Sequence, residues 1–226
     1  MREITKALLE GVTLPAGAIL EVGCGGGSFL AALHRLYPSC PLIGMDLNPV
    51  ALGTARHRYG TLLSLMRGDL HHLPVDDATC AALFALDAFD QMAVQLDVAL
   101  REAARVLKPG GLMLLRVSAY EWLLGPHDRA FGTGRRYGAD EVRRALARAG
   151  FEPRRLSHAN SLLLLPAILA RLAQRQGASE VEGQLSVSPP LNRLLVALLR
   201  AEALWLRTRD LPAGLSLYAL AARAPA

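Results

Sequence analysis

The sequence is short of cysteine, lysine and aromatic residues, and it holds no long apolar run. Its cysteines, Cys24, Cys40 and Cys80, are odd in number and form no CxxC pair, so the sequence predicts neither a disulfide framework nor a metal site and indicates a reducing, cytoplasmic environment. No run of about 18 apolar residues occurs, so no membrane-spanning helix is predicted. Residues 1–14 carry four charged side chains, which is not the composition of a secretory signal.

Lysine occurs only at Lys6 and Lys108, so the net charge of +5 comes from arginine. Residues 1–100 hold 6 basic and 10 acidic residues, a net charge of −4, and residues 101–226 hold 19 and 10, a net charge of +9. A basic second half could face an anionic substrate or a membrane surface, although a general preference for arginine explains it more simply. Aromatic residues make up only 5% and no nucleic-acid module is recognisable, so nucleic acid is not expected as a partner.

What the sequence does contain is a glycine-rich turn between a strand pattern and a helix pattern. Residues 18–22 are apolar apart from Glu21, residues 23–27 hold four glycines, and residues 29–33 begin a helical pattern. Such a unit opens nucleotide-binding α/β domains, where glycine lets the backbone turn tightly and approach a ligand closely. A dinucleotide fingerprint would need its third glycine at position 28, where this chain has Ser28.

The spacing Glu-x-Gly-x-Gly-x-Gly, from Glu21 to Gly27, resembles motif I of the class I S-adenosylmethionine (SAM) dependent methyltransferases. The segment 105–111 matches the Arg-Val-Leu-x-Pro-Gly-Gly of the same family, where it turns a helix into a strand. The resemblance covers residues 18–118, is to the type 11-like members, and implies SAM as the cofactor. The cofactor contacts that it implies in the loop and beside it are Glu21, Gly23, Cys24, Gly25, Gly27, Leu47, Leu70 and Leu86.

Two acidic residues that follow strand patterns are expected to hold the adenosyl group. Asp46 ends the pattern 41–46, 19 positions after Gly27, where a carboxylate can accept hydrogen bonds from both ribose hydroxyls. The alternative is that Asp46 caps the helix beginning near Pro49, but the distance from the glycine turn favours the ribose role. Asp69, in a Gly-Asp pair, resembles the family's contact to the exocyclic amine of adenine. Its alternative is a turn aspartate bonded to its own backbone.

The segment after the strand pattern 80–86 departs from the family. The strand itself is almost wholly apolar, as a central parallel strand should be. Many relatives carry Asp-x-x-Glu-His after it, whereas this chain has Asp-Ala-Phe-Asp-Gln at 87–91. A base role carried by that histidine is therefore lost, and any base has to come from elsewhere.

The long loop 118–137 is expected to build the acceptor site, because it leaves the carboxyl end of a strand and mixes glycine, aromatic and charged residues without periodicity. A base is needed only for an acceptor that arrives protonated, and His127 is the best candidate, with Asp128 to orient it. Alternatively, Asp128 pairs with an arginine of the loop and pins it. The two arginines could clamp a carboxylate or phosphate, and the tyrosine could equally be a packing residue. The candidate acceptor contacts are Trp122, Arg135, Arg136 and Tyr137.

Residues 160–211 separate the last two strand patterns and are too many for a hairpin. Leucine-rich helices are expected at 162–172 and 191–206, with a polar stretch at 173–190 between them. These helices could pack on the sheet, cover an apolar acceptor as a lid, lie on a membrane surface or form a dimer interface. Simple packing is favoured, and the lid is the second choice.

Together these patterns predict one domain over residues 1–226 with a Rossmann-like α/β fold, a seven-stranded mixed sheet of six parallel strands and a last antiparallel strand with helices on both faces. The expected function is methyl transfer from SAM to a small-molecule or lipid-like acceptor, by a monomer or homodimer, with peripheral membrane contact as an added feature and no metal. Two alternatives stay open. A non-catalytic SAM-binding module would suit the Asp90-Gln91 departure, and a dinucleotide oxidoreductase is disfavoured by Ser28.

Overall fold

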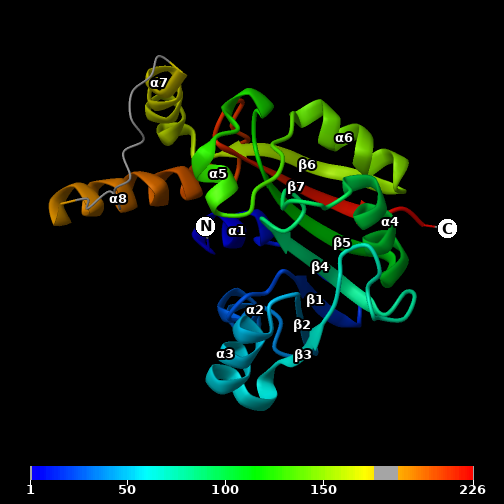
Figure 1. The fold of residues 1–226 in the computed structure, drawn as a ribbon. Helices are drawn as coiled ribbons and strands as arrows, with labels where there is room; N and C mark the ends of the chain where they lie inside the picture. The colour runs from blue at the N-terminus through cyan, green and yellow to red at the C-terminus, as the bar shows by residue number, and fades with distance from the viewer. Residues whose placement is uncertain (1, 176–187, 226) are drawn as a thin grey trace.

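The computed structural model describes residues 2–175 and 188–225, which form a seven-stranded sheet flanked by helices (Figure 1). The polar stretch expected at 173–190 lies mostly outside the described residues. The strands are β1 (Ala18–Val22), β2 (Leu42–Asp46), β3 (Ser64–Arg67), β4 (Cys80–Leu86), β5 (Leu107–Ser118), β6 (Phe151–Ala159) and β7 (Ser216–Arg223). The helices are α1 (Arg2–Leu9), α2 (Ser28–Leu33), α3 (Pro49–Tyr59), α4 (Leu96–Val106), α5 (Pro126–Ala130), α6 (Ala139–Arg148), α7 (Leu164–Arg175) and α8 (Pro189–Trp205), with single 3-10 turns η1 (Gly60–Leu62), η2 (Glu121–Leu123) and η3 (Ser161–Leu163).

The strand order is β3-β2-β1-β4-β5-β7-β6. Strands β1 to β5 run parallel, and β7 lies antiparallel between β5 and β6, with Ala219 opposite both Leu115 and Leu156. Strand β6 therefore points the same way as β1 to β5. The predicted fold class, with six parallel strands and an antiparallel last strand, is confirmed.

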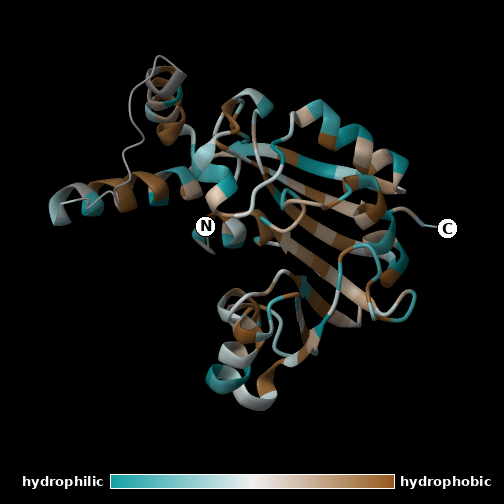
Figure 2. Cartoon of the chain, viewed as in Figure 1, coloured by the Kyte–Doolittle hydropathy of each residue, from teal (hydrophilic) through white to brown (hydrophobic). Residues whose placement is uncertain are grey.

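Alternate residues of β4 pack in two apolar cores, one on each face of the sheet. Leu83 and Ala85 belong to the core shared with α4 and α6, whereas Ala82 and Phe84 belong to the core shared with α1 and α2. Because both faces are covered, the strand needs apolar side chains on both sides and shows no polar alternation. Figure 2 shows this distribution, with brown central strands and a largely teal α6.

Strand β5 begins earlier than the sequence predicts. Cys80 pairs with Leu107 and Ala82 pairs with Leu112, so the residues 108–111 bulge out of the ladder between two paired positions. A Cβ atom added at Gly111 would lie 2.8 Å from the carbonyl oxygen of Lys108, so only glycine fits this bulge. The expected helix-to-strand turn is therefore a bulge inside the first part of β5.

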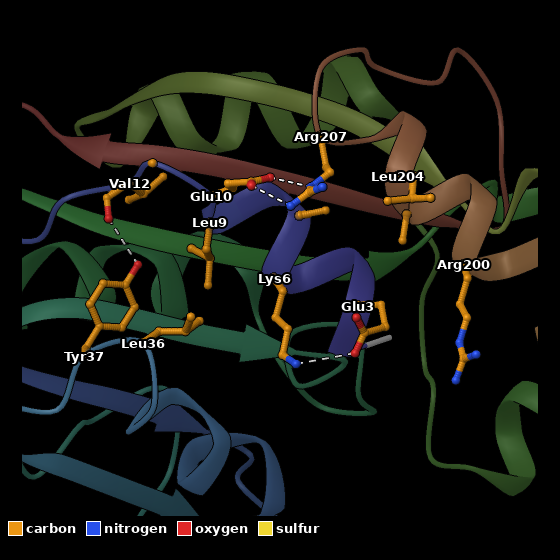
Figure 3. Close-up of a pocket in the computed structure, with 13 residues that line it drawn as sticks. Glu3, Lys6, Leu9, Glu10, Val12, Leu36, Tyr37, Arg200, Leu204 and Arg207 are labelled. Carbon is orange, nitrogen blue, oxygen red and sulfur yellow. Dashed lines mark hydrogen bonds and ion pairs between the residues drawn. The ribbon is translucent and has the colours of Figure 1, made fainter.

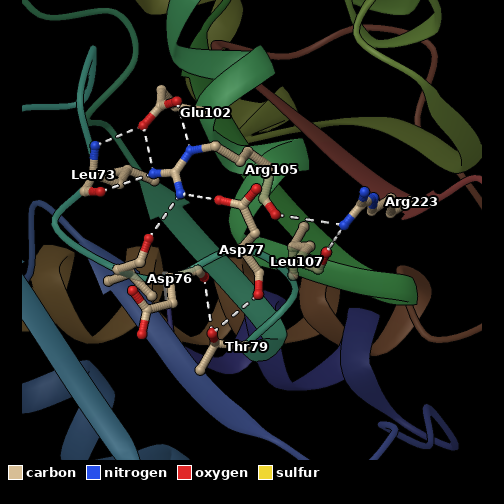
Figure 4. A network of polar contacts seen from close by, with 9 residues as sticks. Leu73, Asp76, Asp77, Thr79, Glu102, Arg105, Leu107 and Arg223 are labelled. Carbon is tan, nitrogen blue, oxygen red and sulfur yellow. Dashed lines mark hydrogen bonds and ion pairs between the residues drawn. The ribbon is translucent and has the colours of Figure 1, made fainter.

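Arg105 of α4 holds the loop that leads into β4 (Figure 4). Its guanidinium donates to the carbonyl oxygens of Leu73, at 2.8 Å, and Val75, at 2.9 Å, and it pairs with Asp77 at 2.6 Å. Glu102 accepts from the backbone N–H of Leu73 at 2.8 Å and binds the same guanidinium at 2.8 Å. The arginine of the 105–111 motif thus fixes the chain between β3 and β4.

Helices α7 and α8 form the insertion between β6 and β7, and α8 projects from the body (Figure 1). Only the last part of α8 and the turn after it pack in the core, through Ala203 and Leu206. Nearer the start of α8, Leu194 is 55% exposed and Leu198 is 36% exposed. The packing on the sheet that the sequence favours is therefore found at the last part of the helix. Within residues 2–175 and 188–225, no helix has the length and apolar character needed to cross a membrane.

Candidate functional site

The carboxyl ends of the parallel strands meet at one edge of the sheet, and the glycine loop lies there after β1. Gly23, Gly25 and Gly27 have φ values of 70°, 53° and 72°, in the left-handed region that favours glycine. A Cβ atom added at Gly23 would lie 2.9 Å from Cβ of Ala88, and one added at Gly27 would lie 2.8 Å from Cδ1 of Leu63. Close packing therefore requires the first and last of these glycines.

Gly25 has a different environment. A Cβ atom added there would meet no atom within 4 Å, so its backbone borders open space. The carboxylate of Asp46 lies beside it, because Oδ2 of Asp46 accepts from the backbone N–H of Gly25 at 2.7 Å. Partly exposed backbone next to a carboxylate suits a flat nucleoside with ribose hydroxyls, so the residues present fit an adenosyl cofactor.

Asp46 joins the end of β2 to the glycine loop, and Asn48 caps α3. Oδ1 of Asp46 accepts from the backbone N–H of Asn48 at 2.8 Å. Oδ1 of Asn48 accepts from Val50 N–H at 2.9 Å, and Pro49 occupies the first helical position. The capping alternative considered for Asp46 therefore applies to Asn48. A carboxylate has about four acceptor positions, so Asp46 keeps capacity for ribose hydroxyls.

The remaining residues expected at the cofactor surround this loop with different exposure. Glu21 is buried in β1. Cys24 packs against Gly44, and burial raises the pKa of its thiol to about 12, with Glu21 and Asp46 acting in the same direction, so the thiol stays neutral. Leu47 is 58% exposed beside Asp46, and the other two expected leucines are partly buried, Leu70 and Leu86.

Asp69 follows β3 and partly fits both roles considered for it. Its Oδ1 accepts from the backbone N–H of His71 at 2.7 Å, which is the turn contact of the alternative role. The same oxygen binds the His71 ring, and Oδ2 has no hydrogen-bond partner among the described residues. The backbone hydrogen bond from His71 is the main cause that lowers the pKa of Asp69, against a smaller effect of burial, so the carboxylate stays ionised.

A cavity of about 460 Å³ lies beside the glycine loop, at the ends of β4 and β5. The two sites meet at residues 87–88, because Ala88 packs on Gly23 and Asp87 lines the cavity. The ionisable residues that line it are Asp87, Arg116, His127, Asp128 and Arg136. Asn160, which immediately follows β6, also lines it. The cavity therefore presents polar groups to whatever enters it.

Two ion pairs line this cavity. Arg136 binds both oxygens of Asp128, with Nη2 to Oδ1 at 2.6 Å and Nε to Oδ2 at 3.1 Å, and Gly125 N–H donates to Asp128 at 2.8 Å. Asp128 therefore has the geometry of the loop-pinning alternative and makes no hydrogen bond to His127 among the described residues. His127 is exposed and packs on Phe131, with ring centroids 4.7 Å apart. The second pair joins Arg116 to Asp87.

Asp87 and Arg116 are cavity residues that the sequence analysis did not propose. Burial raises the pKa of Asp87 to about 6, and Arg116 opposes this rise. Asp87 has a φ of 60°, a left-handed conformation uncommon for aspartate, and its carbonyl oxygen accepts from Gln91 Nε2 at 3.0 Å. A signal was present, since Arg116 interrupts the apolar run of β5 opposite Leu86.

The other candidate acceptor contacts do not line the cavity. Tyr137 is buried, its hydroxyl donates to the carbonyl oxygen of Phe89 at 3.3 Å, and burial raises its pKa to about 12. Arg135 pairs with Glu141 at 2.6 Å and lies over the Tyr137 ring. Trp122 is 46% exposed next to Tyr120. The structure thus brings Arg136, His127 and Asp128 to the cavity, and it places Arg135, Trp122 and Tyr137 outside it.

Asp90 and Gln91, where the sequence departs from the family pattern, hold the long loop in place. Asp90 is 1% exposed, and its Oδ2 accepts from the backbone N–H of Ser118 at 2.9 Å. Its carbonyl oxygen accepts from the backbone N–H groups of Gly134 and Arg135. Gln91 forms a β-bridge with Thr133. Both residues therefore tie the loop after β5 to the end of β4.

A second hollow, of about 640 Å³, lies between α1, α8 and the segment after α2, away from the glycine loop (Figure 3). Glu10, immediately after α1, pairs with Arg207, after α8, at 2.5 Å, and the Tyr37 hydroxyl donates to the carbonyl oxygen of Val12 at 3.3 Å. None of the expected cofactor residues lines it. It is therefore a groove between elements rather than part of the nucleoside site.

Residues 19–111 match the methyltransferase domain family. A malonyl-[acyl-carrier protein] O-methyltransferase of Dechloromonas aromatica is 37% identical over 119 residues, covering 50% of this chain and 42% of that protein. A fatty-acid O-methyltransferase of Mycolicibacterium smegmatis is 35% identical over 97 residues, covering 42% and 35%. A malonyl-[acyl-carrier protein] O-methyltransferase of Geobacter sulfurreducens is 33% identical over 167 residues, covering 66% and 60%. The chain therefore spans less than two thirds of the length of each of these relatives.

Solved structures share the whole fold at low identity. A methyltransferase in complex with the Trm112 activator of Haloferax volcanii has a TM-score of 0.65 at 21% identity, covering 100% of this chain and 90% of that chain. A sarcosine dimethylglycine methyltransferase of Galdieria sulphuraria has a TM-score of 0.65 at 17% identity, covering 98% and 84%. Such likeness shows the fold alone. Over residues 19–111 the chain is similar to the methyltransferase domain family, and it is similar to named methyltransferases over part of their length.

Proposed function

We propose that this chain binds SAM across the glycine loop and transfers the methyl group to an acceptor held in the neighbouring cavity. The observation that carries the proposal is the open backbone at Gly25 beside Asp46, joined through Ala88 to a polar cavity. The family match supports the reaction class. The fold alone would not, because a [4+2]-cyclase also has it, with a TM-score of 0.62 at 23% identity.

In this proposal each end of the nucleoside has an acidic partner. Asp46 accepts hydrogen bonds from the ribose hydroxyls, and Asp69 accepts one from the adenine amine. SAM supplies a methyl group on a positively charged sulfur. The chain has to align the acceptor in line with that methyl group and keep water away, and the packed loop 118–137 is suited to both tasks.

A protonated acceptor would also need a base at the cavity. Asp87 is the better placed candidate, because it lines the cavity at the junction with the glycine loop, and its carboxyl is mostly ionised at pH 7 with a pKa of about 6. His127 lines the same cavity and remains the second candidate, without an acid to orient it among the described residues. An acceptor that arrives ionised, such as a carboxylate, would need neither.

The proposed acceptor is a small or lipid-like molecule with a polar reacting end. The cavity wall is mainly polar, whereas Leu163 on its rim leads into α7, which exposes Leu165 and Leu169. The names of two relatives, a malonyl-[acyl-carrier protein] and a fatty-acid O-methyltransferase, support acceptors with acyl chains. Helices α7 and α8 would then act as a lid over the apolar part of the acceptor or meet a membrane surface.

Calorimetric titration tests cofactor binding directly. SAM and S-adenosylhomocysteine (SAH) should bind the full chain, and NAD⁺ should not. Asp46→Ala should weaken SAH binding roughly tenfold or more, since a carboxylate that accepts two ribose hydroxyls contributes about 1.5–3 kcal/mol. Asn48→Asp, which keeps the helix cap, is the matched control and should bind as wild type does. Binding of NAD⁺ without SAM, or unchanged SAH affinity in Asp46→Ala, would contradict the assignment.

A non-catalytic SAM-binding module is the second candidate, and the polar cavity is the observation against it. The distinguishing measurement is conversion of SAM to SAH in the presence of acyl and hydroxyl acceptors. Tight SAH binding with no conversion across such acceptors would favour the second candidate.

A further inference from the structure

Asp69, the residue expected to face the adenine amine, is itself held by His71. Its Oδ1 accepts two hydrogen bonds from His71, one from the backbone N–H and one from ring Nδ1, each at 2.7 Å. Its Oδ2 binds no described residue, and the side chain is 54% exposed. The carboxylate is therefore fixed through one oxygen and presents the other.

The far side of the imidazole fixes its tautomer. Nε2 of His71 lies 2.9 Å from the backbone nitrogen of Gln95, the residue immediately before α4, and that N–H can only donate. A ring nitrogen that accepts a hydrogen bond carries no proton, so the proton of the neutral ring sits on Nδ1, facing Asp69. The hydrogen bonds thus run in one direction, from Gln95 through His71 to Asp69.

We propose that His71 is a positioning residue that gives the nucleoside site its preference for a 6-amino purine over a 6-oxo purine. The inference rests on the proposed function, in which Asp69 faces adenine. His71 donates its hydrogen bonds to Oδ1 of Asp69, so Oδ2 is left as the acceptor for the ligand. A 6-amino group donates to that oxygen, whereas a 6-oxo group would set oxygen against oxygen.

The other anchor of this loop does not involve Asp69. Arg105 and Glu102 hold the loop at Leu73, so it stays tied to α4 when His71 is replaced. His72 is exposed and pairs with Asp69 only as a backbone bridge. A change of the neighbouring histidine is therefore a matched control for loss of an imidazole in the same loop.

The test is calorimetric titration of the full chain with SAH and with its 6-oxo analogue, S-inosylhomocysteine. Wild type should prefer SAH. His71→Ala should weaken SAH binding roughly tenfold and leave the 6-oxo analogue within about twofold, so that the preference shrinks. His71→Asn, whose amide can donate where Nδ1 does, should restore most of the preference. His72→Ala should match wild type for both ligands.

The inference is overturned if His71→Ala keeps the wild-type preference, or if it loses both ligands equally, which is the result expected of simple damage to the loop. Thermal unfolding checks that each variant is folded. If His71→Ala does not fold, His71→Leu carries the same expectation, because the leucine side chain fills part of the space of the imidazole and has no donor for Asp69. Wild type that binds neither nucleoside would instead overturn the proposed function itself, so the two failures are distinguishable.

Discussion

At the scale of single residues, the cavity is defined by what its charged groups already bind. Arg136 is engaged by Asp128, and Arg116 is engaged by Asp87 and by the Ser216 hydroxyl, at 2.9 Å. An anionic acceptor would have to compete with these internal carboxylates for the guanidinium groups. A neutral polar end meets no such competition, and it would find Asp87 as a proton acceptor.

The titration of Asp87 can be measured without knowing the acceptor. We expect its carboxyl carbon to titrate near pH 6 in a carbon-13 NMR experiment, because burial disfavours the charged form, while Asp69 titrates below the ordinary aspartate range. Arg116→Met should raise the pKa of Asp87 further, since the positive charge of Arg116 lowers it. A midpoint near 4 for Asp87, or a fall in Arg116→Met, would remove the physical basis for Asp87 as a base near neutral pH.

At the scale of elements, the loop between β3 and β4 depends on one guanidinium. Arg105 makes hydrogen bonds that a lysine cannot reproduce, because they need a planar fork of donors. We expect Arg105→Lys to lower the free energy of unfolding by about 2 kcal/mol, measured by urea denaturation. The control is Arg143→Lys in the exposed pair with Asp140 on α6, which should change stability by less than about 0.5 kcal/mol. Equal effects of the two variants would contradict this role.

The sequence predicts most elements because their boundaries are local. Strands β1 and β4 begin and end at the predicted residues, since each is an apolar run with turn or helix signals nearby. The start of β5 is missed because the 108–111 bulge depends on pairing with β4, which no local pattern reports. The glycine loop and Asp46 can be predicted from their spacing, which is a local pattern. Which of Arg135 and Arg136 pairs with Asp128 depends on the folded loop and cannot be predicted in this way.

The Asp87–Arg116 pair shows where reading from the sequence ends. The two residues are 29 positions apart and meet only because β4 and β5 lie side by side in parallel register. The unusual feature in the sequence is an arginine within an apolar strand. What it binds follows from the topology, so the acceptor site is less predictable than the cofactor site, whose parts lie in three consecutive loops.

At the scale of the whole molecule, the insertion places apolar and basic groups on one projecting helix (Figure 1). Leu194, Leu198 and Trp205 follow a helical spacing that puts them on one face of α8, and each is at least 36% exposed. Arg193 and Arg200 lie seven residues apart on a neighbouring face, and neither has an acidic partner within the described ranges. An exposed apolar stripe flanked by cations is the pattern of a helix that lies on an anionic membrane surface.

Binding to lipid vesicles tests this arrangement against the lid and the dimer interface. We expect the full chain to sediment with vesicles containing phosphatidylglycerol and to be released by salt, because exposed charges are screened. The double change Arg193→Gln and Arg200→Gln should weaken that binding roughly thirtyfold, at about 1 kcal/mol per cation, and leave SAH affinity unchanged. Arg143→Gln together with Arg144→Gln on α6 is the matched control.

If the wild-type chain does not bind the vesicles, size-exclusion chromatography distinguishes the remaining possibilities. A dimer that dissociates when Leu194 and Leu198 are changed to serine would assign the apolar stripe to self-association. A monomer would leave a lid over the acceptor as the remaining role of the helix.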